Sequence, residues 1–363
     1  MLLFECDQVA GGKQLRSDEP DMSVYRNAVY NPVQNFYDLD PTWGLYSTDG
    51  LLIEQAAYRR REGLLIGQSE TIGDAQSGIV DTCTDECLYI GPIHTHYGHY
   101  LVTSLARLWP LLKRPGRKVL VHSHVRIEDF LALPFIQETL TAMGISKSDI
   151  VMPTTKTRFT SVVVPSPSFQ ELSFSYLIHG DVCRHISRTL CGQIHDRSTI
   201  PVFLSKMYLN TGVWKFSNEA QLIEKLQRYR LQIAYPEMMT FRDQLAFFNR
   251  HANISGAAGS ALHTSLFAQA PVNVIGLYHS PDIASNFALC DLIAGNTSRY
   301  LYMPNREIQF DYPGFHYGVK IEGVEGIADE LFERISETQR KPSIGSRLRT
   351  AASRGISRIR EMR

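Results

Sequence analysis

Three histidines lie within six residues of the chain, in the pattern His94-x-His96-x-x-His99. The ordinary pKa of histidine is close to neutral, so an imidazole can take a proton from a hydroxyl group. His99 is the first candidate for such a base, because it lies where a predicted strand ends and a helix begins, near the edge of the sheet at which ligands are expected. Two other interpretations stay open: surface histidines packed on Tyr97 and Tyr100, or a metal site that lacks a clear carboxylate partner.

A run of small side chains, GAAGSALH, follows a short apolar segment in the second half of the chain. Small residues let backbone N–H groups approach a ligand, and the start of the next helix offers unpaired N–H groups, which suits a diphosphate. The spacing fits neither the dinucleotide fingerprint nor the P-loop, which disfavours NAD or ATP. Tight packing of a helix on a strand would explain the glycines equally well. The candidates here are Gly256, Gly259, Ser260, Ala261, Leu262 and His263.

Two lysines occur in the segment LSKMYLNTGVWKFSNE, which begins at Leu204. Lys206 follows a predicted strand and Lys215 precedes a predicted helix, so both ammonium groups could stabilise a departing diphosphate. A pair of solvated surface lysines is the alternative. Further candidates for this site are Ser205, Glu237 and Asn218, and Asn218 could equally cap a helix.

Apolar patterning predicts the elements that position these residues. In the second half, short apolar strands alternate with amphipathic helices. Strands are predicted over 201–205, 231–235, 253–255 and 272–277, and helices over 219–229, 240–250 and 262–269. The first half is less regular. It has predicted strands over 119–122, 149–152 and 161–164, a helix over 130–143, and a linking helix over 174–194.

The length of 363 residues suggests two domains. The alternation predicts an α/β fold with parallel sheets, arranged as two Rossmann-like domains that face each other across a cleft. We expect an N-terminal domain over 1–172, a linking helix over 173–198, a C-terminal domain over 199–335 and a tail over 336–363. Ligands are expected where the carboxyl ends of the strands meet the cleft.

Composition narrows the class of protein. Hydrophobic residues make up 44% of the chain, while Lys+Arg and Asp+Glu both number 37, and this balance argues against general nucleic-acid binding. The segment 336–363 is different, with eight basic and two acidic residues and apolar residues at helical spacing. It fits either a basic amphipathic helix on an anionic membrane surface or a solvated terminus.

Several motifs lead to negative expectations. The six cysteines do not form a disulfide framework, and Cys83 and Cys87 lack the partners of a zinc site, so we expect reduced thiols and neither a metal nor a cofactor. Asp38-x-Asp40 resembles a metal–diphosphate motif but has no preceding strand, and coincidence explains it better. Without a signal peptide or a long apolar stretch, the expected location is the cytoplasm, with the tail at the inner face of the cell membrane where it binds lipid.

Three ordered blocks, at 99–109, 204–219 and 236–267, resemble glycosyltransferase family 61, which occurs in bacterial capsule and exopolysaccharide gene sets and among plant xylan-modifying enzymes. The resemblance implies a GT-B arrangement, an inverting reaction and no essential divalent metal. It places the nucleotide-sugar in the C-terminal half and the acceptor in the N-terminal half, where His94, His96 and Arg107 would lie on the acceptor side. Many members have His where this chain has Ala258, and Arg where it has Lys206.

The expected function is therefore a hexosyl- or pentosyltransferase that moves a sugar from a nucleotide-sugar to a polysaccharide or glycolipid acceptor in surface glycan biosynthesis. His99 would be the base, and Lys206 would stabilise the leaving group. Two alternatives stay open, a polysaccharide pyruvyl- or related transferase on the same fold and a non-catalytic member that binds a glycan or a partner.

Overall fold

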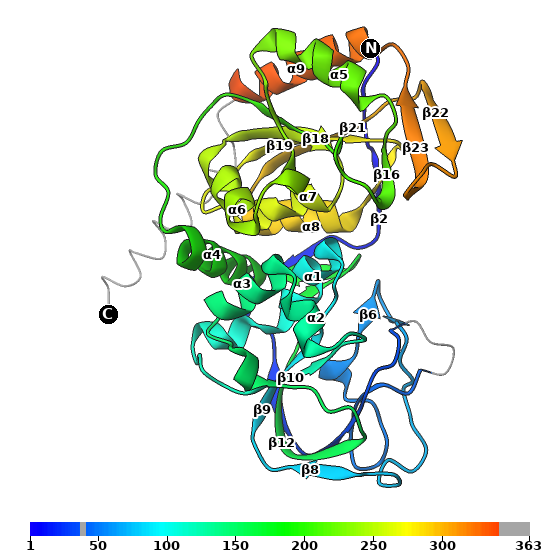
Figure 1. Ribbon diagram of the computed structural model, residues 1–363, viewed down its shortest axis with the longest axis vertical. Helices are drawn as coiled ribbons and strands as arrows, with labels where there is room; N and C mark the ends of the chain where they lie inside the picture. The colour runs from blue at the N-terminus through cyan, green and yellow to red at the C-terminus, as the bar shows by residue number, and fades with distance from the viewer. Residues whose placement is uncertain (37–40, 341–363) are drawn as a thin grey trace. The chain divides into compact units, whose positions relative to one another are not determined.

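The computed structural model describes residues 1–36 and 41–340 (Figure 1). Asp38 and Asp40 lie outside the described residues, as does the tail beyond residue 340. The chain divides into two compact units. Unit 1 comprises Met1–Val9, Gln193–Ile283 and Ala294–Arg363, and unit 2 comprises Ala10–Gly192 and Ala284–Ile293.

Unit 1 is built on a largely parallel sheet with the strand order β1-β21-β19-β18-β15-β17. The parallel strands are β15 (Val202–Leu204), β17 (Gln232–Ala234), β18 (Asn253–Ala257), β19 (Asn273–Tyr278) and β21 (Thr297–Tyr302). Numbered along the chain, their order in space is 2-1-3-4-5, so the winding direction reverses between β15 and β18. In sheets of this kind, ligands bind at the carboxyl ends of the two strands that flank the reversal.

Helices cover both faces of this sheet (Figure 1). The first face carries α5 (Glu219–Leu226) and α9 (Val324–Arg340), and the second carries α6 (Phe241–Arg250) and the single turn α7 (Ser260–His263). Buried leucines and isoleucines of α5 and α9 pack on strand residues such as Phe203. A smaller sheet of β16 (Gly212–Phe216), β22 (Arg306–Phe310) and β23 (Phe315–Ile321) extends the same core.

The edge strand β1 (Phe4–Glu5) completes the unit 1 sheet from the other end of the chain. It pairs antiparallel with β21, opposite Tyr302 and Leu301. Leu3 is fully buried in the core under α9, and the backbone N–H of Leu2 donates to Glu330 on α9 at 2.5 Å. The start of the chain is therefore part of unit 1.

Unit 2 contains a mixed sheet with the order β11-β10-β9-β12-β4-β5. The three predicted strands are present as β10 (Val119–His122), β11 (Ile150–Val151) and β12 (Thr157–Pro165), and β9 (Cys87–Pro92) lies parallel between β10 and β12. The expectation of a wholly parallel sheet is wrong, because β4 (Met22–Asn31) pairs antiparallel with β12, and β5 (Gly44–Tyr46) pairs antiparallel with β4. The mixed α/β class is confirmed.

Three predicted helices differ from the observed ones for local reasons. The segment 130–143 is broken into α2 (Ile127–Leu131) and α3 (Pro134–Ala142), because the proline at the start of α3 holds Leu133 in an extended conformation. The linking helix is α4 (Leu177–Cys191), which ends at Gly192 with a positive φ of 69°. The segment 262–269 contains only the end of α7 followed by a 3-10 turn.

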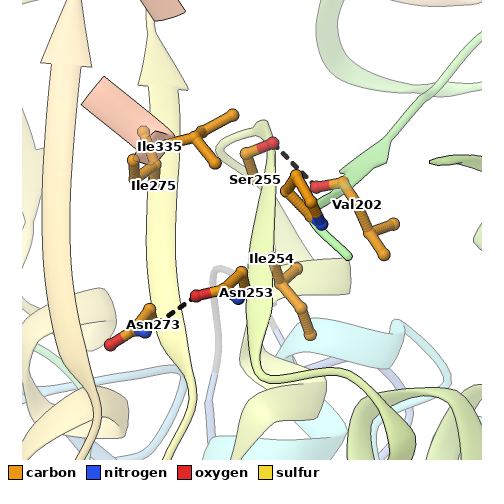
Figure 2. A pocket seen from close by; sticks show the side chains of 8 residues that line it. Val202, Asn253, Ile254, Ser255, Asn273, Ile275 and Ile335 are labelled. Atoms are coloured by element: carbon orange, nitrogen blue, oxygen red, sulfur yellow. Dashed lines mark hydrogen bonds between the residues drawn. The ribbon is translucent and has the colours of Figure 1, made fainter. Parts of the chain in front are cut away.

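A small pocket lies between the sheet and α9 in unit 1 (Figure 2). Two of its polar side chains are satisfied by neighbours: Ser255 Oγ donates to Val202 O at 2.7 Å, and Asn273 Nδ2 donates to Asn253 Oδ1 at 2.8 Å. Its volume of about 10 Å³ is that of a single water molecule, so it is part of the core and not a ligand site. Within residues 1–36 and 41–340, no helix is long and apolar enough to cross a membrane.

Candidate functional site

Lys206 and Gly259 meet at the point in unit 1 where the strand order reverses. Lys206 follows β15 and Gly259 follows β18, so each stands at the carboxyl end of one flanking strand. Lys206 Nζ donates to Ala258 O at 3.2 Å, and a Cβ added to Gly259 would lie 2.8 Å from that nitrogen. The sequence analysis selected both residues, and the fold brings them together.

Glu219, the first residue of α5, lies next to the backbone of Lys206. Both of its carboxylate oxygens accept the backbone N–H of Lys206 at 3.1 Å, and the residue is only 2% exposed. Burial raises the pKa of Glu219 to about 7, although the charge of Lys206 opposes the shift, and burial lowers the pKa of Lys206 to about 8. Burial therefore disfavours the charged form of both groups, and their opposite charges partly offset that effect.

The rings of Trp214, His279 and Tyr317 form an aromatic wall beside Lys206. Lys206 Nζ lies 4.1 Å from the centre of the Trp214 ring, and that ring lies 5.2 Å from the His279 ring. His279 follows β19 at the same sheet edge, and its Nε2 is 2.7 Å from the hydroxyl of Tyr317. Burial lowers the pKa of His279 to about 4, reinforced by the positive charges of Arg306 and Lys206, so the imidazole is neutral at pH 7.

Three other predicted residues hold the loop after β15. Lys215 Nζ donates to the carbonyl oxygens of Met207 at 3.0 Å and Leu209 at 3.2 Å. Glu237 accepts the backbone N–H of Tyr208 at 2.8 Å, and Ser205 Oγ accepts that of Met207 at 2.9 Å. In this structure, all three side chains stabilise the loop that carries Lys206.

Asn218 and Gly256 have packing roles in unit 1. The Asn218 amide donates to Ile321 O and accepts the Ile321 N–H, both at 2.9 Å, and its side chain does not cap α5. Asn218 therefore stands at the predicted N-cap position of α5, but its amide joins the helix to β23 instead of capping it. A Cβ on Gly256 would lie 2.5 Å from Leu204 O, so this glycine permits the close approach of β18 to β15.

The remaining candidates of the small-residue run form α7. Ser260 and Ala261 are half-buried, whereas Leu262 and His263 are buried. Because α7 is a single turn, it has little helix dipole with which to hold an anion. The positive charge beside this run is that of Lys206, whose ammonium group lies against Gly259.

In unit 2, His99 is bound to a buried carboxylate. It lies on α1 (Tyr97–Val102), and its Nδ1 is 2.9 Å from Glu171 Oε1. Thr103 Oγ1 donates to the same oxygen at 2.7 Å, and Arg60 Nη2 lies 3.1 Å from Oε2. The Asn286 amide donates to Oε2 at 3.4 Å. The Glu171 side chain is 1% exposed, so these donors take the place of the water molecules that would otherwise hydrate the carboxylate.

The same donors keep Glu171 ionised. Burial alone would raise its pKa, but the hydrogen bond and charge of His99, the charge of Arg60 and the hydroxyl of Thr103 outweigh burial and lower the pKa to about 2. A carboxylate at this position fixes the His99 tautomer with the proton on Nδ1, which leaves Nε2 as a proton acceptor. The His99 side chain is 29% exposed, so solvent can reach it.

His94 and His96 lie on the same segment as His99, with their rings close to its imidazole. Their rings lie 5.7 Å and 5.1 Å from the His99 ring. Burial lowers the pKa of His94 to about 3 and also lowers that of His96, with His99 as the next contributor, so both are neutral at pH 7. In the described chain, no group of three or more His, Cys, Asp or Glu residues could hold a metal ion.

Arg107 is fully buried in unit 2. Its guanidinium donates to Gln55 O at 2.8 and 3.1 Å and to Ala57 O at 2.9 Å. Backbone carbonyls occupy the donors that a ligand would need. This environment supports a structural role for Arg107 in anchoring the segment around Gln55.

The sequence analysis missed Glu171 and Glu219, together with the aromatic wall. His279 carried a usable signal, because it directly follows the predicted strand 272–277 at the expected ligand edge. Glu219 lay within a block that had already been singled out. Glu171 gave no signal, because it is 72 residues from His99 in a segment without periodicity.

The model of the protein family described as Glycosyltransferase 61 matches residues 97–275 of this chain. The matched segment contains His99 and Glu171 of unit 2 as well as Lys206, Glu219 and Gly259 of unit 1. No curated protein matches the chain.

Proposed function

The chain belongs to glycosyltransferase family 61 and therefore has a glycosyltransferase role in glycan biosynthesis, and from this premise we propose that it is an inverting, metal-independent hexosyl- or pentosyltransferase. The donor would be a nucleotide-sugar bound by unit 1, and the acceptor a polysaccharide or lipid-linked glycan of the cell surface bound by unit 2. In this proposal the two units are the halves of a GT-B arrangement.

The observation that carries the proposal is the position of Lys206. The ammonium group lies where β15 and β18 diverge, and it is bound by the carbonyl oxygens of Ala258 and Trp214. Carbonyl groups leave its formal positive charge in place, so it remains available to an anion. A diphosphate at this edge would gain a charge-assisted hydrogen bond from Lys206, and the missing Cβ of Gly259 lets the ammonium group lie against the turn after β18.

The reaction follows from these two sites. His99 Nε2 would take the proton of the acceptor hydroxyl, whose oxygen attacks the anomeric carbon of the donor. The bond from that carbon to the diphosphate oxygen breaks on the opposite face, and the electron pair leaves with the nucleoside diphosphate. Lys206 would stabilise the charge that grows on the leaving group. Glu171 would hold the base in its reactive tautomer.

Single substitutions test these roles in a donor-turnover assay that follows nucleoside diphosphate release. His99→Ala should lower turnover about 10²-fold or more, the usual contribution of a general base. Lys206→Ala should lower it by a similar factor, while Lys206→Arg should retain activity because Arg keeps the charge. Unchanged rates in both alanine variants would remove the assignments. A thermal-shift screen of nucleotides and nucleotide-sugars would then identify the donor.

We also propose that the protein acts in the cytoplasm and binds the inner membrane face through the basic segment 336–363. The proposal depends on the charge of that segment, which has eight basic and two acidic residues. Full-length protein should float with anionic liposomes, and flotation should fall as salt rises. Equal flotation of a chain ending at Glu337 would contradict it.

A further inference from the structure

Unit 2 contains a pocket of about 630 Å³ that the proposed mechanism does not use. Its size lies in the range of small-ligand sites. Charged and planar side chains dominate the lining, principally Arg16, Glu54, Arg59, Glu62, Glu70 and Phe174. We infer that this pocket binds a neutral stretch of the acceptor glycan, some way along the chain from the reacting hydroxyl.

The charges of the pocket argue against an anionic ligand. Three carboxylates face two guanidinium groups, and Glu54 already neutralises Arg59 through two hydrogen bonds of 2.8 Å. A phosphate or a uronate would therefore meet the exposed carboxylates of Glu62 and Glu70. Sugar hydroxyls suit the same lining, because they donate to carboxylates and accept from guanidinium groups.

A preorganised flat surface forms part of the pocket. The Arg16 guanidinium stacks 3.9 Å over the centre of the Phe174 ring, and it donates to Gln14 Oε1 at 3.0 Å and to Tyr176 Oη at 3.0 Å. These residues lie on two paired strands, β3 (Gln14–Arg16) and β14 (Phe174–Tyr176). A fixed guanidinium–aromatic stack can receive the flat C–H face of a sugar ring without further ordering.

The chain connects this pocket to the base. Arg59 lines the pocket, and the next residue, Arg60, pairs with Glu171. Gln170 and Leu172 also line it, on either side of Glu171, which holds His99. A glycan seated here lies beside the network that orients the base, so it would help to place the reacting hydroxyl. The link to catalysis rests on the proposed function, whereas the binding itself does not.

Saturation-transfer NMR on the full-length protein tests the binding without any donor. The probes are neutral cello-, malto- and xylo-oligosaccharides of increasing length, with hyaluronan oligosaccharides as the anionic comparison. We expect at least one neutral series to bind, with affinity that increases with length. Arg16→Ala should weaken this binding about tenfold, the loss typical of a binding hot spot. Arg16→Lys should weaken it too, because lysine cannot form the planar stack.

Arg26→Ala is the matched control, since Arg26 is an exposed arginine on β4 of the same unit. It should bind as the wild type does, with thermal unfolding monitored for all variants. Lys206→Ala should lose transfer but keep oligosaccharide binding, which separates a failure of the proposed reaction from a failure of this site. Binding of no neutral series, preference for hyaluronan, or equal affinity of Arg16→Ala and wild type would each overturn the inference.

Discussion

Glu171→Gln is the most informative single perturbation of unit 2, because it preserves shape and removes charge. The carboxylate receives donors from His99, Thr103, Arg60 and Asn286. A glutamine has one acceptor oxygen, so its NH₂ group must face at least one of these donors. The imidazole then loses the partner that fixes its proton on Nδ1, or the Arg60 guanidinium loses its counter-charge.

The effect on stability follows from the pKa shift. The pKa of Glu171 is lowered from 4.5 to about 2, and one unit is worth 1.36 kcal/mol, so the ionised carboxylate stabilises the fold by about 3 kcal/mol. Because the folded-state pKa is depressed, this contribution is present above the unfolded-state pKa and is lost as pH falls from about 4.5 to about 2. The variant should lack that pH-dependent contribution.

Two measurements check this reasoning. Urea unfolding midpoints at pH 7 and at lower pH should show the variant less stable at neutral pH, with the difference shrinking as the wild type is acidified. Donor turnover with an acceptor present should fall about 10²-fold or more, because the base is no longer held in its reactive tautomer. Glu19→Gln is the control, because Glu19 is an exposed glutamate of the same unit that pairs with the exposed Lys113 and lines neither site. Wild-type turnover together with an unchanged pH profile of unfolding would refute the reasoning.

Three further predictions concern unit 1. Donor affinity should fall as pH rises through about 8, because Lys206 then loses the proton, and with it the charge, that binds the diphosphate. Titration calorimetry from pH 6 to 9 measures this affinity, and Lys206→Arg is the reference whose affinity should not change with pH. Gly259→Ala should weaken nucleotide-sugar binding about tenfold with little loss of stability, because the added Cβ contacts the flexible end of Lys206. Gly256→Ala should lower the midpoint of thermal unfolding, because its Cβ would lie against the backbone oxygen of Leu204. His279→Phe, which keeps a ring but removes the bond to Tyr317, should weaken donor binding in thermal-shift titrations, and wild-type affinity would exclude the wall from the donor site.

Sequence patterning predicts the neighbourhood of Lys206 and Gly259 well, for a physical reason. Both follow apolar strands of one alternating α/β segment, and parallel strands bring their carboxyl ends to the same edge. The carboxylate partner of His99 could not be found in this way. Glu171 contacts His99 only because the chain folds back after 72 residues. The sequence around Glu171 contains no local pattern that would predict this contact.

The strand pairing in the sheet of unit 2 also could not be predicted from local sequence patterns. The pairing of β4 with β12 joins residues 22–31 to residues 157–165, and its antiparallel direction is a property of the tertiary fold. Local signals do better where one residue decides the outcome. Pro134, for example, is enough to explain why the apolar pattern over 130–143 gives two short helices.

The pairing of β1 with β21 sets an order of events during synthesis. Residues 4 and 5 leave the ribosome almost 300 residues before their partners at 301 and 302. The main segment of unit 2, residues 10–192, can assemble during that interval, while unit 1 must wait for its last strands. A separately expressed fragment beginning at residue 193 would lack Leu3 and expose the β21 edge, so we expect it to aggregate unless the first nine residues are supplied as a peptide.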